Sequence, residues 1–136
     1  MKKIFLDTNI ILDILQRRGV FFLPASNLFS LGMQGKYIMY ISPLTFVNCI
    51  YILRKYCGYE QALNYMKVIK KYVLLTNMRE EELNLAIDTK GKDIEDMLQY
   101  YSAVNVGCEV VVTRNKKDFP QSGIPIMTAE ELLNNY

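Results

Sequence analysis

The chain has 136 residues, of which 51% are apolar, enough for one hydrophobic core and too few for two domains of usual size. Charged residues make up 22% of the chain and the formal net charge is +2, which argues against a disordered segment and against a strongly basic protein that wraps nucleic acid. We therefore expect a single domain over residues 1–136.

The sequence contains no histidine, which limits the kinds of catalytic site and metal site that it can form. It removes serine-histidine triads, histidine general bases and most transition-metal sites. The three cysteines, Cys49, Cys57 and Cys108, lack the spacing of a metal site and imply no disulfide framework. The N-terminus lacks a signal-peptide pattern, and no apolar run approaches the roughly 18 residues of a membrane span. We expect a cytoplasmic protein with no membrane contact.

Strand and helix patterns alternate along the chain. Short apolar or β-branched runs predict strands at residues 3–6, 37–41, 72–75, 109–112 and 124–127. Helical spacing of apolar residues predicts helices at residues 9–17, 24–34, 44–57, 61–70, 78–89 and 93–106, and a last helix from residue 128. Almost wholly apolar strands separated by helices favour an α/β fold, with three layers and a central, mostly parallel sheet covered on both faces.

Aspartates stand where these elements join. Asp7 ends the first strand, Asp93 and Asp96 share a face in the first turn of a helix, and Asp118 lies in the loop after another strand. Each has an ordinary structural explanation. Asp7 and Asp93 can cap helices, which stabilises by about 1 kcal/mol, Asp96 can face the positive end of a helix dipole, and Asp118 can be a turn residue.

The combination favours a binding site. Ligands of parallel sheets bind beyond the carboxyl ends of the strands, and all four aspartates can lie on that rim. Two carboxylates about 5 Å apart repel by roughly 3 kcal/mol at an effective dielectric of 20, which exceeds a typical helix cap. A bound Mg²⁺ or Mn²⁺ ion would relieve that repulsion, since hard divalent ions prefer oxygen ligands.

Four stretches carry a resemblance to a known family: LDTNIILDIL around Asp7, ISPLTFVNCIYILRK, KDIEDMLQYYSAVNVGCEVVVTRNKKDF and GIPIMTAEELL. In order and spacing they resemble the PIN-domain nucleases, notably the VapC-like group that supplies the toxin ribonuclease of many toxin-antitoxin pairs. The resemblance covers nearly the whole chain. It implies a PIN-like fold and an Mg²⁺- or Mn²⁺-dependent endoribonuclease that cleaves RNA phosphodiester bonds.

Site residues follow from the same resemblance. It implies catalytic roles for Asp7, Asp96 and Asp118, with Asp7 and Asp96 as metal ligands and Asp93 as a further ligand or a support for one. Substrate contacts or support of the ligands are implied or expected for a wider group: Thr8, Asn9, Asn48, Thr113, Arg114 and Asn115.

Two of these positions depart from the common family pattern. Asn48 stands where many members have a glutamate, as in a subgroup with asparagine there, and Asn115 stands where aspartate is frequent. Both changes remove negative charge. They leave open a second function, a catalytically weak PIN-like module that binds RNA or a protein. An aspartyl-phosphate phosphatase or receiver domain is a third reading, which the asparagine at position 9 disfavours.

Partners are expected from the same family. RNA is the implied substrate, a small antitoxin protein is a possible partner, and a homodimer is expected. Tyr51, Tyr56 and Tyr59 could belong to a subunit interface, although aromatic residues at helical spacing more often lie in a core.

Overall fold

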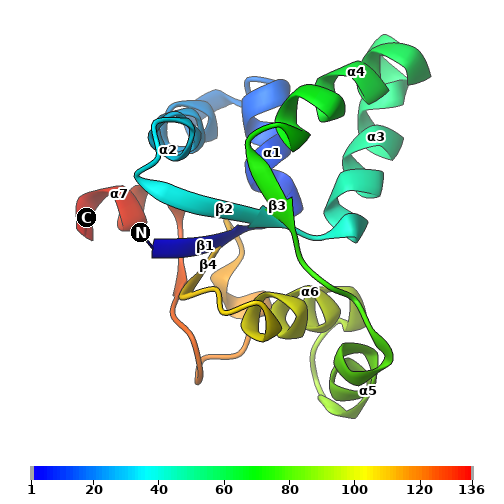
Figure 1. Cartoon of the computed structure of the whole chain (residues 1–136), viewed down its shortest axis with the longest axis vertical. Coiled ribbons are helices and arrows are strands. Elements are labelled where there is room, and N and C mark those ends of the chain that lie inside the picture. The colour runs from blue at the N-terminus through cyan, green and yellow to red at the C-terminus, as the bar shows by residue number, and fades with distance from the viewer. Residues whose placement is uncertain (1, 136) are drawn as a thin grey trace.

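The structure, a computed structural model, describes residues 2–135 and is organised around a five-stranded sheet (Figure 1). The strands are β1 (Lys2–Leu6), β2 (Tyr37–Ile41), β3 (Val73–Leu75), β4 (Val110–Val112) and β5 (Ile126–Met127). Their order across the sheet is β3-β2-β1-β4-β5, and every neighbouring pair is parallel. The predicted mostly parallel sheet is therefore parallel throughout.

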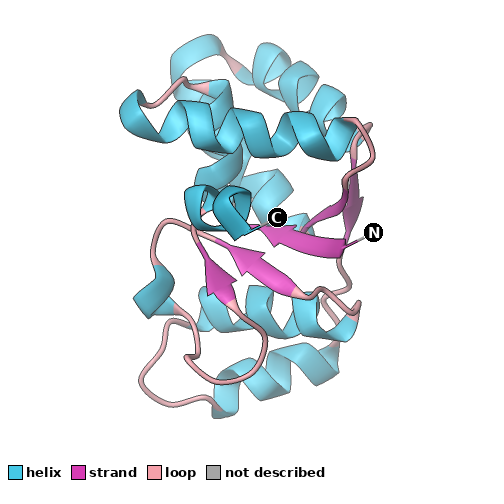
Figure 2. Cartoon of the chain, turned by 90° about the vertical axis from the view of Figure 1, so that its left-hand side faces the viewer, coloured by secondary structure: helices cyan, strands magenta, loops and turns pink. Residues whose placement is uncertain are grey.

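Helices cover both faces of the sheet (Figure 2). They are α1 (Thr8–Leu15), α2 (Phe22–Met33), α3 (Pro43–Cys57), α4 (Tyr59–Lys70), α5 (Glu80–Asp88), α6 (Ile94–Asn105) and α7 (Ala129–Asn135). Two short 3₁₀ segments, η1 (Gly19–Phe21) and η2 (Lys116–Asp118), complete the set. In Figure 1, α1 to α4 lie above the strands and α5 and α6 below them.

The core has two parts, because successive side chains of a strand point to opposite faces of the sheet. Ile4 and Leu6 of β1 pack with residues of α1 to α4 and α7, whereas Phe5 packs with residues of α5 and α6. All three side chains are fully buried. Burial on both faces explains why the strands are apolar without a polar alternation, as the sequence predicts for a parallel sheet.

Most predicted elements match the observed ones within one or two residues, and the differences are local. The last strand is shorter than predicted and begins at Ile126, and α2 begins at Phe22, before Pro24, after the η1 turn. The aromatic residues Tyr51, Tyr56 and Tyr59 are exposed, so their placement in a core is wrong.

Helix α5 shows the largest error in predicted packing. The helical spacing of apolar residues predicts that Leu83, Ala86 and Ile87 face inward. Ala86 is buried, but Leu83 and Ile87 are 40% and 58% exposed. Glu82 is buried instead, because Arg79 donates to both of its carboxylate oxygens at 3.0 and 2.8 Å. An ion pair with two hydrogen bonds lets a charged residue occupy the inner side of this short helix.

None of the helices described in residues 2–135 is long and apolar enough to cross a membrane.

Candidate active site at the carboxyl edge of the sheet

Asp7 is held in place by the ends of two adjacent parallel strands. Leu6 of β1 lies opposite Val112 of β4, so the next residues, Asp7 and Thr113, emerge side by side. The Asp7 amide donates to the Val112 carbonyl at 3.0 Å. The Thr113 hydroxyl donates to Asp7 Oδ2 at 2.8 Å, and the Thr8 amide donates to Oδ1 at 2.8 Å.

Burial dominates the electrostatics of this carboxyl group. The Asp7 residue is only 7% exposed, and burial raises the pKa of its carboxyl above the usual value. The hydrogen bonds from Thr113 and Thr8 oppose that rise in pKa, a nearby Asp118 adds to it, and Arg114 opposes it. Each oxygen accepts one hydrogen bond, which leaves lone pairs free for another ligand.

Asp7 opens onto a cavity of about 420 Å³. Its polar lining consists of four acids and four amides: Asp7, Glu95, Asp96 and Asp118, with Asn9, Asn48, Gln99 and Asn115. Thr8, Tyr51 and Ile52 complete the wall. Within the described chain, no lysine or arginine lines this cavity. We call it the acidic pocket.

Asp96 enters the acidic pocket from the first turn of α6. Asp93 caps this helix, and its Oδ1 accepts hydrogen bonds from the amides of Glu95 and Asp96 at 2.9 and 3.2 Å. Burial is the largest cause that raises the pKa of Asp96 to about 7, and the charges of four acids add to it: Asp7, Asp93, Asp118 and Glu95. Asp7 and Asp96 therefore line one pocket, where the charge of Asp7 adds to the rise in the pKa of Asp96.

Asn48 orients a carboxylate that the sequence did not single out. Its Nδ2 donates to Glu95 Oε1 at 2.8 Å, which joins α3 to the first turn of α6. The helix position where the family resemblance leads us to expect a glutamate thus carries an amide that binds an acid from the neighbouring helix. Glu95 restores negative charge on the side of the acidic pocket where Asn48 removes it.

Hydroxyl groups behind the acidic pocket hold Gln99. The Thr45 and Ser42 hydroxyls lie 2.6 and 3.1 Å from Gln99 Oε1, and the Thr8 hydroxyl lies 3.1 Å from that of Thr45. Ser42, Thr45 and Gln99 are at most 1% exposed. This network connects the ends of β1 and β2 to α6.

The structure brings most of the predicted site residues together. Those that line the acidic pocket are Asp7, Thr8, Asn9, Asn48, Asp96, Asn115 and Asp118. Thr113 is fully buried behind Asp7 and contacts its carboxylate. Glu95 and Gln99 line the pocket but were missed, although their spacing of four on a helix beside Asp96 places all three near one face.

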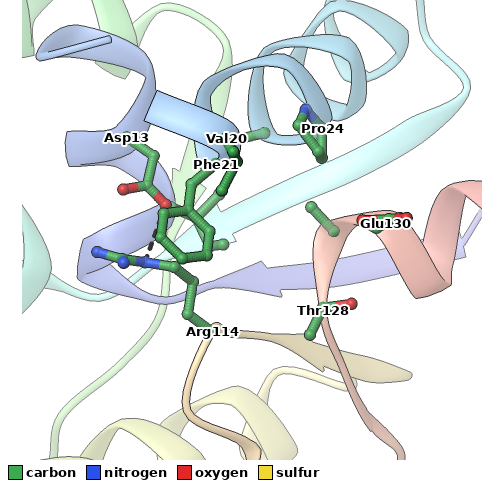
Figure 3. A pocket seen from close by; sticks show the side chains of 10 residues that line it. Asp13, Val20, Phe21, Pro24, Arg114, Thr128 and Glu130 are labelled. Carbon is green, nitrogen blue, oxygen red and sulfur yellow. Dashed lines mark ion pairs between the residues drawn. The ribbon is translucent and has the colours of Figure 1, made fainter. Parts of the chain in front are cut away.

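Two predicted residues lie elsewhere. Asp93 caps α6 and does not line the pocket, which fits the predicted support of Asp96, and its role as a further ligand stays a prediction. Arg114 points into a separate cavity of about 190 Å³ between α1, η1 and the start of α7 (Figure 3). Its Nε lies 3.1 Å from Asp13 Oδ2 and its guanidinium lies 4.1 Å from the centre of the Phe21 ring. The expected contact of Arg114 with substrate on the Asp7 rim is not supported.

The donor set of the acidic pocket fits a hard divalent ion. Carboxylate and amide oxygens are the ligands that Mg²⁺ and Mn²⁺ prefer. Among residues 2–135, no three acidic or cysteine side chains are gathered closely enough to hold one ion together. Mg²⁺ commonly binds through only one or two carboxylates and keeps several waters, so a site for this ion does not need three acids.

Comparison with known proteins agrees with this fold. A family model described as PIN domain matches residues 3–117. Ribonuclease VapC1 of Aquifex aeolicus (strain VF5) is 27% identical over 140 residues, which cover 99% of this chain and 96% of that protein.

Solved structures show the same architecture. DNA-bound VapBC from Salmonella typhimurium matches with a TM-score of 0.71 and 21% identity, over 95% of this chain and 99% of that chain. VapC20 of Mycobacterium tuberculosis, described as a sarcin-ricin loop cleaving toxin, matches with a TM-score of 0.63 and 13% identity, over 79% and 86% of the two chains. Because the family model spans most of the chain, the chain belongs to the PIN domain family.

Proposed function

We propose that this chain is a ribonuclease that cleaves RNA phosphodiester bonds with a divalent ion, Mg²⁺ or Mn²⁺, held by Asp7 and Asp96. The observation that carries the proposal is the convergence of these two carboxylates, from β1 and α6, on one acidic pocket without a lining cation in the described chain. The likeness to Ribonuclease VapC1 over nearly the full length supports it.

The residues around the acidic pocket have different roles in the proposed reaction. When bound, the ion supplies Lewis acidity, lowering the pKa of a water and offsetting charge on the phosphate. Thr113 and Thr8 fix the orientation of Asp7 through one hydrogen bond to each oxygen. Asp93 fixes the first turn of α6 and so the direction from which Asp96 enters. Groups that orient ligands in this way commonly affect metal affinity as well as activity.

Two further acids, Glu95 and Asp118, add negative charge to the acidic pocket. Asn48 holds Glu95 in the acidic pocket, and Asp118 supplies another carboxylate from η2. The asparagines at positions 48 and 115 therefore do not empty the pocket of acids. This removes the main reason to favour a catalytically weak binding module.

The relatives support a proposal for the role in the cell. VapBC structures from Salmonella typhimurium and Rickettsia felis are complexes bound to DNA, and in the latter the DNA is a promoter fragment. We infer that this chain acts in the cytoplasm as the toxin of a toxin-antitoxin pair, with a small antitoxin protein as partner.

A homodimer is part of the same proposal. Tyr56 and Tyr59 expose 75% and 56% of their surfaces at the junction of α3 and α4, where a second subunit can cover them. Tyr51, which is 54% exposed, lies earlier on α3 at the edge of the acidic pocket. Light scattering after size exclusion should give about twice the chain mass of 15.8 kDa. A monomer at micromolar concentration would contradict this part.

Cleavage of a labelled single-stranded RNA tests the enzymatic proposal. The purified chain should cut the RNA with Mg²⁺ or Mn²⁺ and should stop when excess chelator is added. Asp7→Asn and Asp96→Asn, purified in the same way, should lose at least about 100-fold in rate, because each removes a ligand charge. Cleavage in chelator, or by either variant at the wild-type rate, would rule out the mechanism.

A further inference from the structure

We propose that the side-chain amide of Gln99 binds a phosphate oxygen of the RNA, donating a hydrogen bond through Nε2 beside Asp7 and Asp96. This inference rests on the proposed function, because it assumes that an RNA phosphate enters the acidic pocket. It assigns a substrate-binding role to a residue that neither the family resemblance nor the aspartate pattern singled out.

The orientation of the amide follows from its distance to Thr45. The 2.6 Å separation between Thr45 Oγ1 and Gln99 Oε1 is typical of a hydroxyl that donates to a carbonyl oxygen. The Ser42 hydroxyl lies 3.1 Å from the same oxygen, so two hydroxyl groups converge on Oε1. Oxygen therefore faces the hydroxyls of Ser42 and Thr45, and nitrogen faces the other way.

The nitrogen consequently faces the acidic pocket. Gln99 is 1% exposed and lines this pocket, and Nε2 has no hydrogen-bond partner within residues 2–135. Nε2 is not among the fully buried unpaired atoms of the described chain, so it is accessible from the pocket, where it can donate to an acceptor from outside the chain.

Charge explains why this donor suits a phosphate. A phosphate that approaches four acids is repelled, and a divalent ion offsets only part of that repulsion. Lysine or arginine in the same place would pair with the carboxylates and compete with the ion. A neutral amide that is anchored at its oxygen donates to the phosphate without displacing the metal.

Two substitutions separate a donor from a purely structural residue. Gln99→Glu keeps an oxygen to accept from Ser42 and Thr45 but replaces the donor with an acceptor. Gln99→Met removes both functions without adding charge. Gln61→Glu, on the exposed side of α4, is the matched control for the added charge. Melting temperatures identify any variant that fails to fold, in which case the other one decides.

Cleavage kinetics give the first readout. Both Gln99 variants should lose roughly 10- to 100-fold in kcat/KM, as expected for one hydrogen bond to a charged group, while Gln61→Glu behaves as wild type. Wild-type kinetics in Gln99→Glu would show a structural role through the hydroxyls and overturn the proposal. Wild-type kinetics in Gln99→Met would overturn it as well.

Nitrogen-edited NMR gives a second readout that needs no turnover. The Nε2 proton pair of Gln99, assigned by its absence in Gln99→Met, should shift when single-stranded RNA is added to the Asp7→Asn protein. A pair that stays in place while other signals report RNA binding would contradict the phosphate contact. A wild-type chain that binds RNA and shifts this pair but never cleaves would overturn the ribonuclease proposal alone. A chain that neither binds nor cleaves RNA would overturn both.

Discussion

The Thr113 hydroxyl donates a 2.8 Å hydrogen bond to Asp7 Oδ2, although 106 positions separate the two residues in the chain. Parallel pairing of β1 with β4 brings them together, since each residue directly follows its strand. Both residues are buried. The sheet topology thus fixes the direction of the carboxylate at the centre of the proposed site.

Removal of this hydroxyl should weaken the metal site. Thr113→Val keeps the shape of the side chain and leaves Asp7 Oδ2 without its donor. We expect a loss of 10- to 100-fold in activity or metal affinity, and about 1–3 kcal/mol in stability. Thr113→Ser, which retains the hydroxyl, is the control. Unchanged Mg²⁺ affinity and rate in Thr113→Val would show that orientation of Asp7 does not matter.

Asp7→Asn should separate activity from folding. Burial raises the pKa of Asp7, so its ionised form is unfavourable in the folded protein when no cation is bound. The neutral asparagine removes that cost, and the melting temperature without divalent ions should be equal to or above that of wild type at pH 8. Thermal unfolding beside the cleavage assay checks this expectation. A strongly destabilised variant would mean that Asp7 is mainly structural.

Stability should depend on pH through Asp96. Its folded pKa of about 7 lies above the ordinary value of 3.8, so the folded protein holds more protons than the unfolded chain between these values. Its contribution to stability is therefore present at pH 4 and is lost as the pH rises toward 7 and above. Without divalent ions, the melting temperature of Asp96→Asn relative to wild type should increase from pH 4 to pH 8.

Mg²⁺ should reverse this trend in the wild-type protein. The ion binds the ionised carboxylates, so the rise in melting temperature that it causes should grow between pH 5 and pH 8. Asp96→Asn should show a smaller rise at every pH. An Mg²⁺ shift that is the same at both ends of the range would contradict coupling between ion binding and these carboxylates.

The ion pair of Asp13 with Arg114 in the second cavity leads to a prediction about stability and not about activity. Asp13 is 1% exposed, and Arg114 Nε lies 3.1 Å from its Oδ2 (Figure 3). Arg18 Nη1 lies 3.9 Å from Asp13 Oδ1. Arg114→Met leaves a buried carboxylate with one distant cation and should cost about 3 kcal/mol. Burial already raises the pKa of Asp13, so the loss should be larger at pH 8 than at pH 5.

The double variant Asp13→Asn with Arg114→Met is the control for that pair. It removes the unpaired charge and should recover most of the lost stability, as measured by chemical denaturation. If the two substitutions were simply additive, Asp13 and Arg114 would not interact, despite the short distance between them.

The local pattern of apolar residues predicts the helices and strands, and it also predicts which acids lie at the strand ends. The change from a continuous apolar run to helical spacing after Leu6 marks a junction, and such junctions collect at one edge of a parallel sheet. The position of Asp7 follows from that rule. Asp96 reaches the same pocket because it lies in the first turn of α6.

Side-chain pairings between distant elements could not be predicted in the same way. Arg114 and Thr113 are adjacent in sequence, yet one pairs with Asp13 and the other with Asp7, because alternate residues after a strand point to opposite sides. The contact of Asn48 with Glu95 depends on the packing of α3 beside α6. These contacts between segments far apart in the chain are where the site differs from the one predicted.

A crystal soaked with Mn²⁺ and measured at a wavelength where manganese scatters anomalously tests the central claim most directly. The proposal predicts an anomalous peak in the acidic pocket within about 2.3 Å of oxygens from both Asp7 and Asp96, and no such peak in Asp7→Asn. A map without a peak there, at an Mn²⁺ concentration that supports RNA cleavage in solution, would contradict it.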